Sequence, residues 1–262
     1  MLRIDGLDFR YKSKNILKDV GMELNRGEVL SVVGPNGTGK TTLLKCIAGI
    51  MKPGKGTILI DGEDISQMKI QKIAKSVAYV PQSLPSRFPI TVFDAVLMGR
   101  RPHIAWKPRQ KDLELVAAIL KNMHLHDIAL QDFDQLSGGQ KQKVLLARAV
   151  AQDTDYLLLD EPTSNLDLKH QMEAMVMIYN MVKKKKVAAI LAMHDLNLSS
   201  RFSDRMVMLK AGRVFCSGEP RQVMTVENIK SVYGVEAEII PTNGHPYILP
   251  TMPVNEQKIT EN

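Results

Sequence analysis

The sequence predicts a mixed α/β protein with a strand–helix core, an N-terminal antiparallel β part and an inserted helical part. Apolar runs at residues 29–33, 156–159 and 187–193 each end at glycine, carboxylate or histidine residues, as central strands of a parallel sheet do. Residues 1–28 alternate apolar and polar side chains, which is typical of half-buried strands. Residues 91–151 repeat apolar side chains at helical spacing. The helical block therefore interrupts the strand–helix order, as an inserted subdomain does.

Length and composition fit one large domain. The 262 residues can hold a single α/β domain, and an apolar fraction of 44% with 24% charged residues is ordinary for a globular chain. No apolar run approaches the ~18 residues that a membrane span needs, and the N-terminus lacks the apolar core of a signal peptide. We therefore expect a cytosolic chain, unless a partner holds it at a membrane.

The chain is basic. It has 35 Lys and Arg residues against 28 Asp and Glu residues, a net charge of +7, which suits nucleic acid, an anionic lipid surface or a nucleotide. The run Lys183–Lys186 lies between a helical pattern and a strand, so we interpret it as a solvated helix end. Cys46 and Cys216 have no metal-ligand spacing, and we expect both to be buried apolar residues in a reducing compartment.

A phosphate-binding motif follows the first apolar run. The pattern G-x-x-x-x-G-K-[ST] is matched by Gly34, Pro35, Asn36, Gly37, Thr38, Gly39, Lys40 and Thr41. A helical pattern continues from Thr41 through Thr42 to Ala48. The glycines allow successive N–H groups to point at phosphate oxygens, and the helix adds its positive N-terminal end. Lys40 would lie between the β- and γ-phosphates, and the Thr41 hydroxyl would ligate Mg²⁺. The segment predicts a nucleoside triphosphate site.

Shorter elements surround this motif. Residues 1–28 predict short strands, and Tyr11 among them is either a ring that stacks on adenine or an ordinary edge-strand tyrosine. The other predicted elements are a strand at 57–60, a tight turn at Asp61–Gly62, a strand at 77–80 that ends at Pro81–Gln82, and a hairpin around 211–212. The last part, 221–262, predicts a short helix, a Pro-rich segment and a polar tail that frays.

A loop at 99–108 lies within the helical block. It carries arginine, histidine and the only tryptophan of the sequence. Exposed aromatic and arginine residues are enriched where proteins dock. The loop is therefore either a docking segment or a solvated loop with a half-buried tryptophan, and the residues alone do not decide. Residues 83–89, which contain prolines and other loop-forming residues, separate the strand pattern before them from the helical pattern after them.

Polar side chains end the two later core strands. Asp160 and Glu161 follow Tyr156–Leu159, and His194 follows the strand at 187–193. The carboxyl ends of parallel strands meet at one edge of the sheet, where ligands bind. Downstream of a P-loop, Asp160 would hold Mg²⁺ through water and Glu161 would polarise an attacking water. His194 would hydrogen-bond the γ-phosphate.

A second anion site is predicted at Leu136-Ser137-Gly138-Gly139-Gln140. Ser137 is placed as the N-cap of the helix that follows, and the two glycines expose backbone N–H groups at its positive end. This segment belongs to the helical block, away from the P-loop. Two copies arranged head to tail would bring one chain's P-loop against the other chain's Ser137, enclosing two nucleotides.

In order and completeness these motifs resemble those of the ABC ATPase family, over nearly the whole chain. The resemblance implies a P-loop NTPase fold with a mixed RecA-like core. It further implies one ABC ATPase domain over 1–262, with a nucleotide-binding core and β subdomain at 1–82 and 152–220, a helical subdomain at 83–151 and a C-terminal extension at 221–262.

The resemblance also implies roles for single residues. Tyr11 would stack on adenine, and Asp167 in the D-loop Ser164–Asp167 would communicate across the dimer. Gln82 would contact Mg²⁺ and the attacking water and link to membrane subunits. Catalysis would rest on Glu161, His194 and Gln82, and Mg²⁺ on Thr41, Gln82 and Asp160. The partner's nucleotide would meet Ser137, Gly138, Gly139 and Gln140.

Other ABC classes fit less well. DNA-repair and chromosome members separate their motifs by long coiled coils, and no sustained heptads lie between residues 41 and 136 here. Translation members carry two ATPase halves in one chain, and export fusions carry membrane spans. The sequence therefore favours a stand-alone importer motor with no nucleic-acid partner.

Finer resemblance points to one group of importers. Residues 91–103, 193–199 and 232–235 are similar to segments of motors for iron-siderophore, haem and cobalamin uptake. That group implies two motor copies under two multi-span permeases, at the cytoplasmic face of the cell (inner) membrane, fed by an extracytoplasmic binding protein. These segments do not face the cargo, so import of molybdate, tungstate or another metal stays an alternative.

Overall fold

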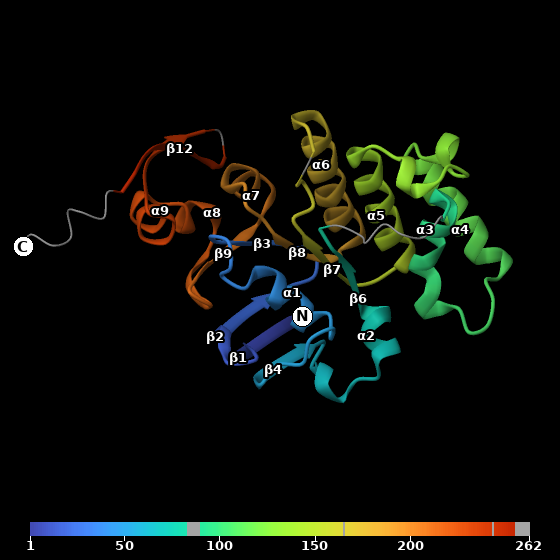
Figure 1. Cartoon of the computed structure of the whole chain (residues 1–262), viewed down its shortest axis with the longest axis horizontal. Coiled ribbons are helices and arrows are strands. Elements are labelled where there is room, and N and C mark those ends of the chain that lie inside the picture. The colour runs from blue at the N-terminus through green and yellow to red at the C-terminus, as the bar shows by residue number, and fades with distance from the viewer. Residues whose placement is uncertain (83–89, 165, 243, 255–262) are drawn as a thin grey trace, which may run out of the picture.

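The computed structural model describes residues 1–82, 90–164, 166–242 and 244–254. Its centre is a six-stranded sheet in the order β10-β9-β3-β8-β7-β6, in which only β10 runs antiparallel to its neighbour (Figure 1). The strands are β3 (Val29–Val33), β6 (Val77–Val80), β7 (Tyr156–Asp160), β8 (Ala188–Ala192), β9 (Arg205–Lys210) and β10 (Arg213–Gly218). Every residue of β3, β7 and β8 is buried, because these strands are covered on both faces. The α/β prediction is confirmed.

A second, antiparallel sheet is built mainly from the N-terminal residues. Its order is β2-β1-β4-β5, and its strands are β1 (Leu2–Tyr11), β2 (Lys14–Leu24), β4 (Lys55–Ile60) and β5 (Glu63–Asp64). The prediction of short strands was wrong here, since β1 has 10 residues and β2 has 11. Register shifts between Ile4 and Phe9 break the simple alternation, so one continuous strand resembles two short ones in the sequence.

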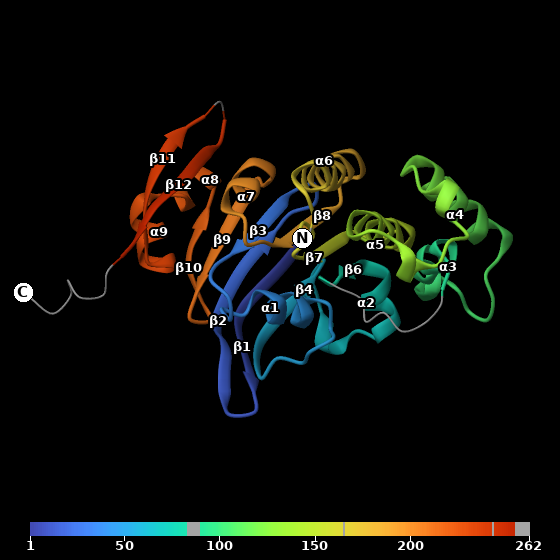
Figure 2. The same cartoon turned by 45° about the horizontal axis from the view of Figure 1, so that its top comes forward.

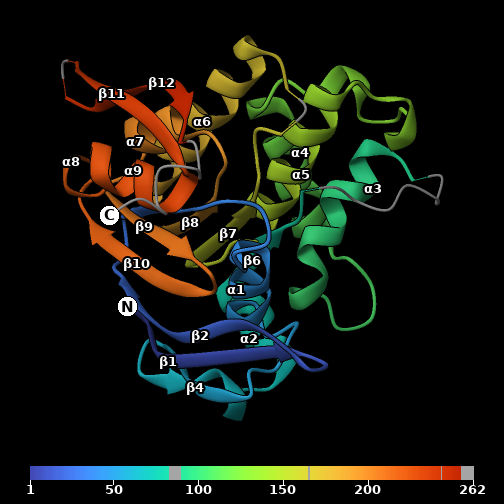
Figure 3. The same ribbon diagram turned by 60° about the vertical axis from the view of Figure 1, so that its left-hand side comes forward.

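Helix α1 (Lys40–Ile47) lies between the two sheets (Figure 3). Its apolar side packs into a core shared by both sheets, with Leu43, Leu44, Cys46 and Ile47 at or near zero exposure. Burial raises the pKa of Cys46 to about 12, which keeps the thiol protonated. Cys46 is thus the apolar filler that was predicted. The same prediction was wrong for Cys216, which is only half-buried, at the antiparallel edge strand β10.

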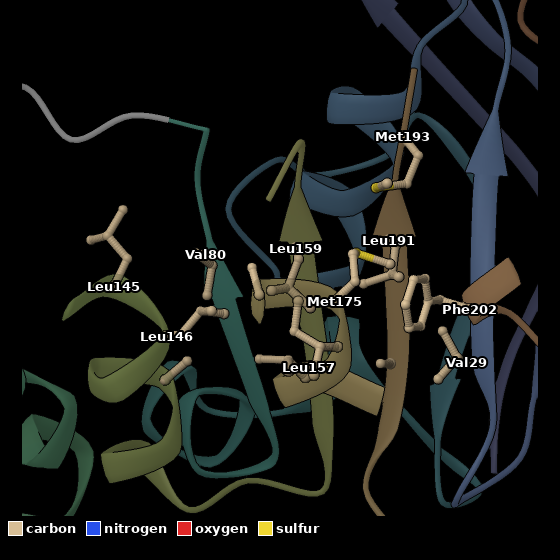
Figure 4. Packing of buried hydrophobic residues seen from close by; sticks show 14 of the residues in the cluster. Val29, Val80, Leu145, Leu146, Leu157, Leu159, Met175, Leu191, Met193 and Phe202 are labelled. Carbon is tan, nitrogen blue, oxygen red and sulfur yellow. The ribbon is translucent and has the colours of Figure 1, made fainter. Parts of the chain in front are cut away.

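The opposite face of the central sheet carries a second core. Figure 4 shows Leu157, Leu159 and Leu191 of the sheet with Met175 and Leu146 of the helices that cover it. The helical block begins after β6 and returns to the sheet through the last of its helices. Its elements are α3 (Val92–Leu97), η2 (Met98–His103), α4 (Gln110–Asn122), η3 (His126–Ile128), η4 (Phe133–Gln135) and α5 (Gly138–Gln152).

The remaining helices lie on both faces. The short η1 (Ile65–Gln67) and α2 (Ile70–Ser76) pack in the core between the two sheets. The others complete the helical face and the C-terminal part, and they are α6 (Leu168–Lys185), α7 (Leu196–Phe202), α8 (Pro220–Val223) and α9 (Val226–Tyr233). Lys183, in the last turn of α6 and in the predicted solvated run, pairs with Asp204, while the three lysines after it are exposed. Within the described ranges, no helix combines the length and apolar character that crossing a bilayer requires.

The C-terminal region differs from its prediction. The predicted Pro-rich segment contains two strands that were not predicted: β11 (Val235–Pro241) and β12 (Pro246–Pro253) form an antiparallel hairpin beside α7 and α9 (Figure 2). Ala237 and Ile248 are buried under it. A pair of strands that stands apart from the central sheet has free edges, where proline is tolerated, so the prolines hid the strands from sequence analysis. The predicted polar tail at 255–262 lies outside the described residues.

Candidate active site

The P-loop connects β3 to α1 at the carboxyl edge of the central sheet. Gly34, Gly37 and Gly39 have φ values of 148°, 79° and 102°, which a residue with a Cβ rarely adopts. A Cβ on Gly34 would lie 2.4 Å from the carbonyl oxygen of Leu209, and one on Gly39 would lie 2.6 Å from Leu17. Two of the glycines are therefore required by packing as well as by conformation, and the loop's path depends on them.

Lys40 lies beneath this loop. Its Nζ donates hydrogen bonds to the carbonyl oxygens of Gly34 at 2.6 Å and Pro35 at 3.2 Å, and the residue is 6% exposed. Burial lowers the pKa of Lys40, while the nearby carboxylates of Glu161 and Asp160 act in the opposite direction. The arrangement places one desolvated ammonium among backbone groups, where an anionic ligand gains most from it.

Asp160, the last residue of β7, is held by two hydroxyl groups. Thr41 donates from Oγ1 to Asp160 Oδ1 at 2.9 Å, and Tyr79 of β6 donates from its hydroxyl to Asp160 Oδ2 at 3.0 Å. Burial, and then the Asp160 charge and this hydrogen bond, raise the pKa of Tyr79, so its hydroxyl stays a donor. A carboxylate and a hydroxyl thus lie within one hydrogen bond of each other at the start of α1.

Glu161 lies between two polar side chains from different elements. Gln82 Nε2 donates to Glu161 Oε2 at 2.5 Å, and His194 Nε2 hydrogen-bonds Glu161 Oε1. Its backbone N–H donates to the carbonyl of Ala192 at 2.9 Å, and its φ of 51° lies in the left-handed region. The sequence placed these three side chains at strand ends, and the folded chain brings them into direct contact.

A cavity of about 260 Å³ opens above the P-loop. Its lining is Lys14, Ile16, Asn36, Gly37, Gly39, Lys40, Thr41, Thr42, Glu161 and His194. Lys14 and Ile16 were not predicted. They belong to β2, which the sequence places far from the loop, and only the β1–β2 pairing beside α1 brings them to it. Tyr11 is 61% exposed at the end of β1 and is not among the lining residues.

The Leu136–Gln140 motif forms the N-terminus of α5. Ser137 Oγ accepts from the Gln140 N–H at 3.3 Å, and Gln140 Oε1 accepts from the Ser137 N–H at 2.9 Å, a capping box. A Cβ on Gly139 would lie 3.1 Å from the His170 ring. Gly138, which is exposed, opens the helix beside it. None of these residues lines the cavity, so one chain does not bring the motif to the P-loop.

Asp167 caps α6. Its Oδ1 accepts from the His170 N–H at 2.9 Å and contacts the His170 ring at Nδ1 at 2.7 Å. The His170 N–H, and then its ring, lower the pKa of the exposed Asp167 carboxyl. His170 therefore joins the segment at Asp167 to the start of α5 through Gly139. Of the predicted D-loop, residue 165 lies outside the described residues.

The residues present fit a nucleoside triphosphate with its metal ion. Backbone N–H groups at the P-loop glycines, the buried Lys40 ammonium and the helix N-terminus are all complementary to phosphate oxygens. Thr41 and Asp160 supply the hard oxygen donors that Mg²⁺ prefers. The oxygen ligands suited to Mg²⁺ thus lie next to the groups that are complementary to phosphate.

Comparison with known proteins supports the same reading. The ABC transporter family matches residues 17–164. An uncharacterized ABC transporter ATP-binding protein of Methanocaldococcus jannaschii is 50% identical over 250 residues, covering 95% of this chain and 98% of that protein. The petrobactin import ATP-binding protein FpuC of Bacillus anthracis is 32% identical, with 95% and 93% covered. The cobalamin import ATP-binding protein BtuD of Halobacterium salinarum is 36% identical over 91% of this chain and 60% of that protein.

Two solved structures resemble most or nearly all of the chain. A metal-chelate type ABC transporter in an inward-facing conformation has a TM-score of 0.83 at 30% identity, covering 98% of this chain and 99% of that one. A dimeric ATP-binding cassette in a post-hydrolysis state, bound to ADP and Pi, has a TM-score of 0.75 at 27% identity, covering 84% and 98%.

Fold and site together define a P-loop ATPase. The chain belongs to the ABC transporter family. The family matches more than half of its length, and a relative in the family is 50% identical to it over 250 residues. It is an ATP-binding subunit of a transporter and hydrolyses ATP.

Proposed function

We propose that the chain is the motor subunit of a membrane importer for metal chelates of the iron-siderophore, haem or cobalamin type. The observation that carries the catalytic part is Glu161, whose two carboxylate oxygens are hydrogen-bonded by Gln82 and His194 at the wall of the P-loop cavity. A carboxylate fixed beside a phosphate cradle is placed to polarise water for in-line attack on the γ-phosphate.

Nucleotide binding is assigned to the cavity and the residues next to it. The backbone N–H groups between Gly34 and Gly39 (Pro35 has none) and the side chains of Lys40, Thr41 and Thr42 hold the phosphates, and Tyr11 stacks on the adenine. Thr41, Gln82 and Asp160 would hold Mg²⁺, which would neutralise phosphate charge. Desolvation of Lys40 strengthens its interaction with phosphate, because the surrounding dielectric is low.

The complete site is proposed to need a second copy of the chain. Gly138 and Gly139 present backbone N–H groups at the start of α5, while the N–H groups of Ser137 and Gln140 are used in the capping box. All four residues lie outside the cavity of their own chain. A head-to-tail dimer brings them onto the nucleotide bound by the partner. Asp167 is near the same segment, because it contacts the His170 ring, which lies against Gly139. Hydrolysis removes the γ-phosphate contacts that hold the two copies together.

Closure of that dimer is proposed to drive two multi-span permease subunits from the cytoplasmic face of the cell membrane, where the chain is peripheral. An extracytoplasmic binding protein delivers the cargo.

In the proposed division, residues 1–82 and 152–220 form the nucleotide-binding core with its β subdomain, 83–151 form the helical subdomain, and 221–262 form an extension. Relatives named for petrobactin and cobalamin import, and the metal-chelate type transporter, support this cargo class over molybdate or tungstate.

The test is recovery of the tagged chain from its native membranes, with mass spectrometry of the proteins that accompany it. Recovery of a multi-span permease, followed by ATP-dependent uptake of a siderophore, haem or corrinoid in proteoliposomes of the pair, is expected. A motor carrying Lys40→Ala is the matched control and should abolish uptake. Recovery of ribosomes or DNA-associated proteins without any membrane protein would contradict the importer assignment.

A further inference from the structure

The loop between η2 and α4 presents an unusually exposed aromatic side chain. Trp106, the only tryptophan of the sequence, is 93% exposed. In Figures 1 and 2 this green loop, which follows α3 and precedes α4, projects from the edge of the helical block. A single exposed apolar side chain is common at protein surfaces, so the surroundings of this ring decide whether it marks an interaction surface. The catalytic site does not use this loop.

The charge around Trp106 has one sign. Residues 95–111 contain lysine and arginine but no aspartate or glutamate. Arg100 is already engaged, since its Nε pairs with the buried Asp112 at 3.1 Å and its Nη1 donates to the Ala151 carbonyl at 2.9 Å. The cations left on the surface are Arg101, Lys107, Arg109 and Lys111, and among the described residues none of the four lies within ion-pair distance of a carboxylate.

Helix α2 extends the same surface. Ile70 is 75% exposed and, with Arg101 and Ile104, borders a shallow hollow of about 250 Å³ between α2 and the loop. The surface therefore combines apolar side chains that protrude with long cationic side chains around them. We call it the loop patch and define it as Ile70, Arg101, Ile104, Trp106, Lys107, Arg109 and Lys111.

We propose that the loop patch binds an anionic phospholipid surface, with the Trp106 ring at the headgroup level. The inference deepens the proposed function, because it rests on the chain working at a membrane. Tryptophan favours the membrane–water interface, and long basic side chains reach anionic headgroups while their stems cover apolar surface. An exposed ring with exposed cations within five residues of it in the sequence, none of them paired with a carboxylate among the described residues, suits a deformable, negatively charged plane.

The experiment uses the full chain and its single tryptophan as the probe. Vesicles of phosphatidylcholine and phosphatidylglycerol at about 3:1 should shift Trp106 emission to the blue and sediment the protein, whereas pure phosphatidylcholine should do neither. Raised salt should release the protein, since exposed charges are screened. Each basic residue removed from the patch should weaken partitioning about fivefold.

Matched variants separate the patch from net charge. Replacing Lys107, Arg109 and Lys111 by Gln should abolish sedimentation with anionic vesicles, and Trp106→Ala should weaken it. Replacing the exposed Lys184, Lys185 and Lys186 by Gln removes the same charge elsewhere and should leave binding unchanged. Equal losses in both triple variants would overturn the proposal, as would an emission shift that needs membranes containing the permease. ATPase activity of both triple variants should stay normal. A loss of ATPase activity would concern the proposed function, whereas a loss of vesicle binding alone concerns the loop patch, so the two failures are distinguished.

Discussion

Glu161 is the residue on which the proposed chemistry depends, and its backbone is strained. A φ of 51° in a residue with a Cβ costs about 1–2 kcal/mol unless the surroundings hold it. Here three contacts from other elements do so: Gln82, His194 and the Ala192 carbonyl. The strain turns the side chain away from the path of β7 and into the cavity wall, where a carboxylate is useful.

Glu161→Gln should lower the kcat of ATP hydrolysis by about 10²–10⁴-fold, because an amide cannot polarise water as a carboxylate does. Nucleotide affinity should be retained, since Lys40 and the P-loop are untouched. Single-turnover hydrolysis and equilibrium binding of ATP measure the two effects separately. A kcat within a few-fold of the unmodified chain would show that the base lies elsewhere.

Lys40→Ala should lose nucleotide affinity as well as activity. Charge-assisted hydrogen bonds contribute about 1.5–3 kcal/mol each, so the dissociation constant should rise by roughly 10–100-fold. Calorimetric titration with ATP in the presence of Mg²⁺ measures it. Lys45→Ala removes a lysine from the same helix without touching the cavity and is the control. Equal affinity in both variants would argue against a phosphate role for Lys40.

Tyr79 is a positioning residue that no motif indicates. Tyr79→Phe removes the hydrogen bond to Asp160 Oδ2 and keeps the ring, so the carboxylate should be less well oriented toward the metal. We expect about a 10-fold higher Mn²⁺ dissociation constant, followed by electron paramagnetic resonance with nucleotide present. Thermal stability should change little. Unchanged Mn²⁺ affinity with lowered stability would assign Tyr79 a structural role only.

The difference between Lys40 and Tyr79 shows how far sequence analysis reaches at this scale. Lys40, Asp160 and Glu161 sit in short patterns whose spacing carries their meaning, so they could be named as site residues before the fold was known. Tyr79, Lys14 and Ile16 reach the site only through strand pairing and helix packing between distant segments. Local pattern has no information about such contacts. Whether Tyr11 stacks on adenine stays a prediction.

At the scale of elements, Asp61 joins the two sheets. It lies in the turn after β4, and its carboxylate accepts from the Tyr156 hydroxyl of β7 at 2.7 Å, from Arg26 at 2.9 Å and from the N-terminal amino group at 2.6 Å. Burial raises the pKa of Asp61, but these hydrogen bonds outweigh it and lower the pKa to about 2. The turn was predicted from Asp61–Gly62, while its partners were not, because all three come from other segments.

Asp61→Asn should therefore destabilise the chain at neutral pH. A folded-state pKa of about 2 against an ordinary value of 3.8 means stability that is fully present above pH 3.8 and lost as the pH falls toward 2. The side chain is 42% exposed, so screening reduces the effect to about 1 kcal/mol. Urea unfolding at pH 7 and near pH 2.5 measures it. The exposed Asp127→Asn is the control, and a difference that persists at low pH would contradict the linkage.

The C-terminal hairpin marks the limit of prediction for elements. Asn197 of α7 brackets β12, donating to the Ile248 carbonyl at 3.1 Å and accepting from the Ile248 N–H at 2.7 Å. The hairpin thus depends on a side chain about fifty residues earlier, which no local pattern reveals. The core strands, by contrast, were predictable because each is a continuous apolar run that needs only burial on both faces.

At the scale of the whole molecule, the two proposed anion sites lie on different parts of one chain. The P-loop cavity belongs to the sheet core, whereas Ser137 opens α5 of the helical block and lines no part of that cavity. A dimeric neighbour in a post-hydrolysis state has the same fold over 84% of this chain. In a two-fold head-to-tail dimer each nucleotide meets one P-loop with its Glu161 and the other chain's Ser137. This geometry makes a prediction that no single-chain site would make.

Two inactive variants should restore activity when mixed, provided that their defects lie on opposite halves of the composite site. Lys40→Ala disables a P-loop and Ser137→Arg disables the opposing motif, so each homodimer should be inactive. The mixed dimer pairs the intact P-loop of the Ser137→Arg chain with the intact motif of the Lys40→Ala chain. Random exchange then predicts roughly a quarter of the normal ATPase rate.

The control mixes Lys40→Ala with Glu161→Gln. Both changes lie on the P-loop side of their own chain, so each site of that mixed dimer keeps a defect and no activity should return. The assay is phosphate release after co-refolding or co-expression of the two chains, with permease added so that dimers form. Recovery in the first mixture alone requires a site shared between chains, because two defects within one self-contained site cannot compensate for each other. Recovery in neither mixture, despite proven mixed dimers, would place the whole catalytic site within a single chain.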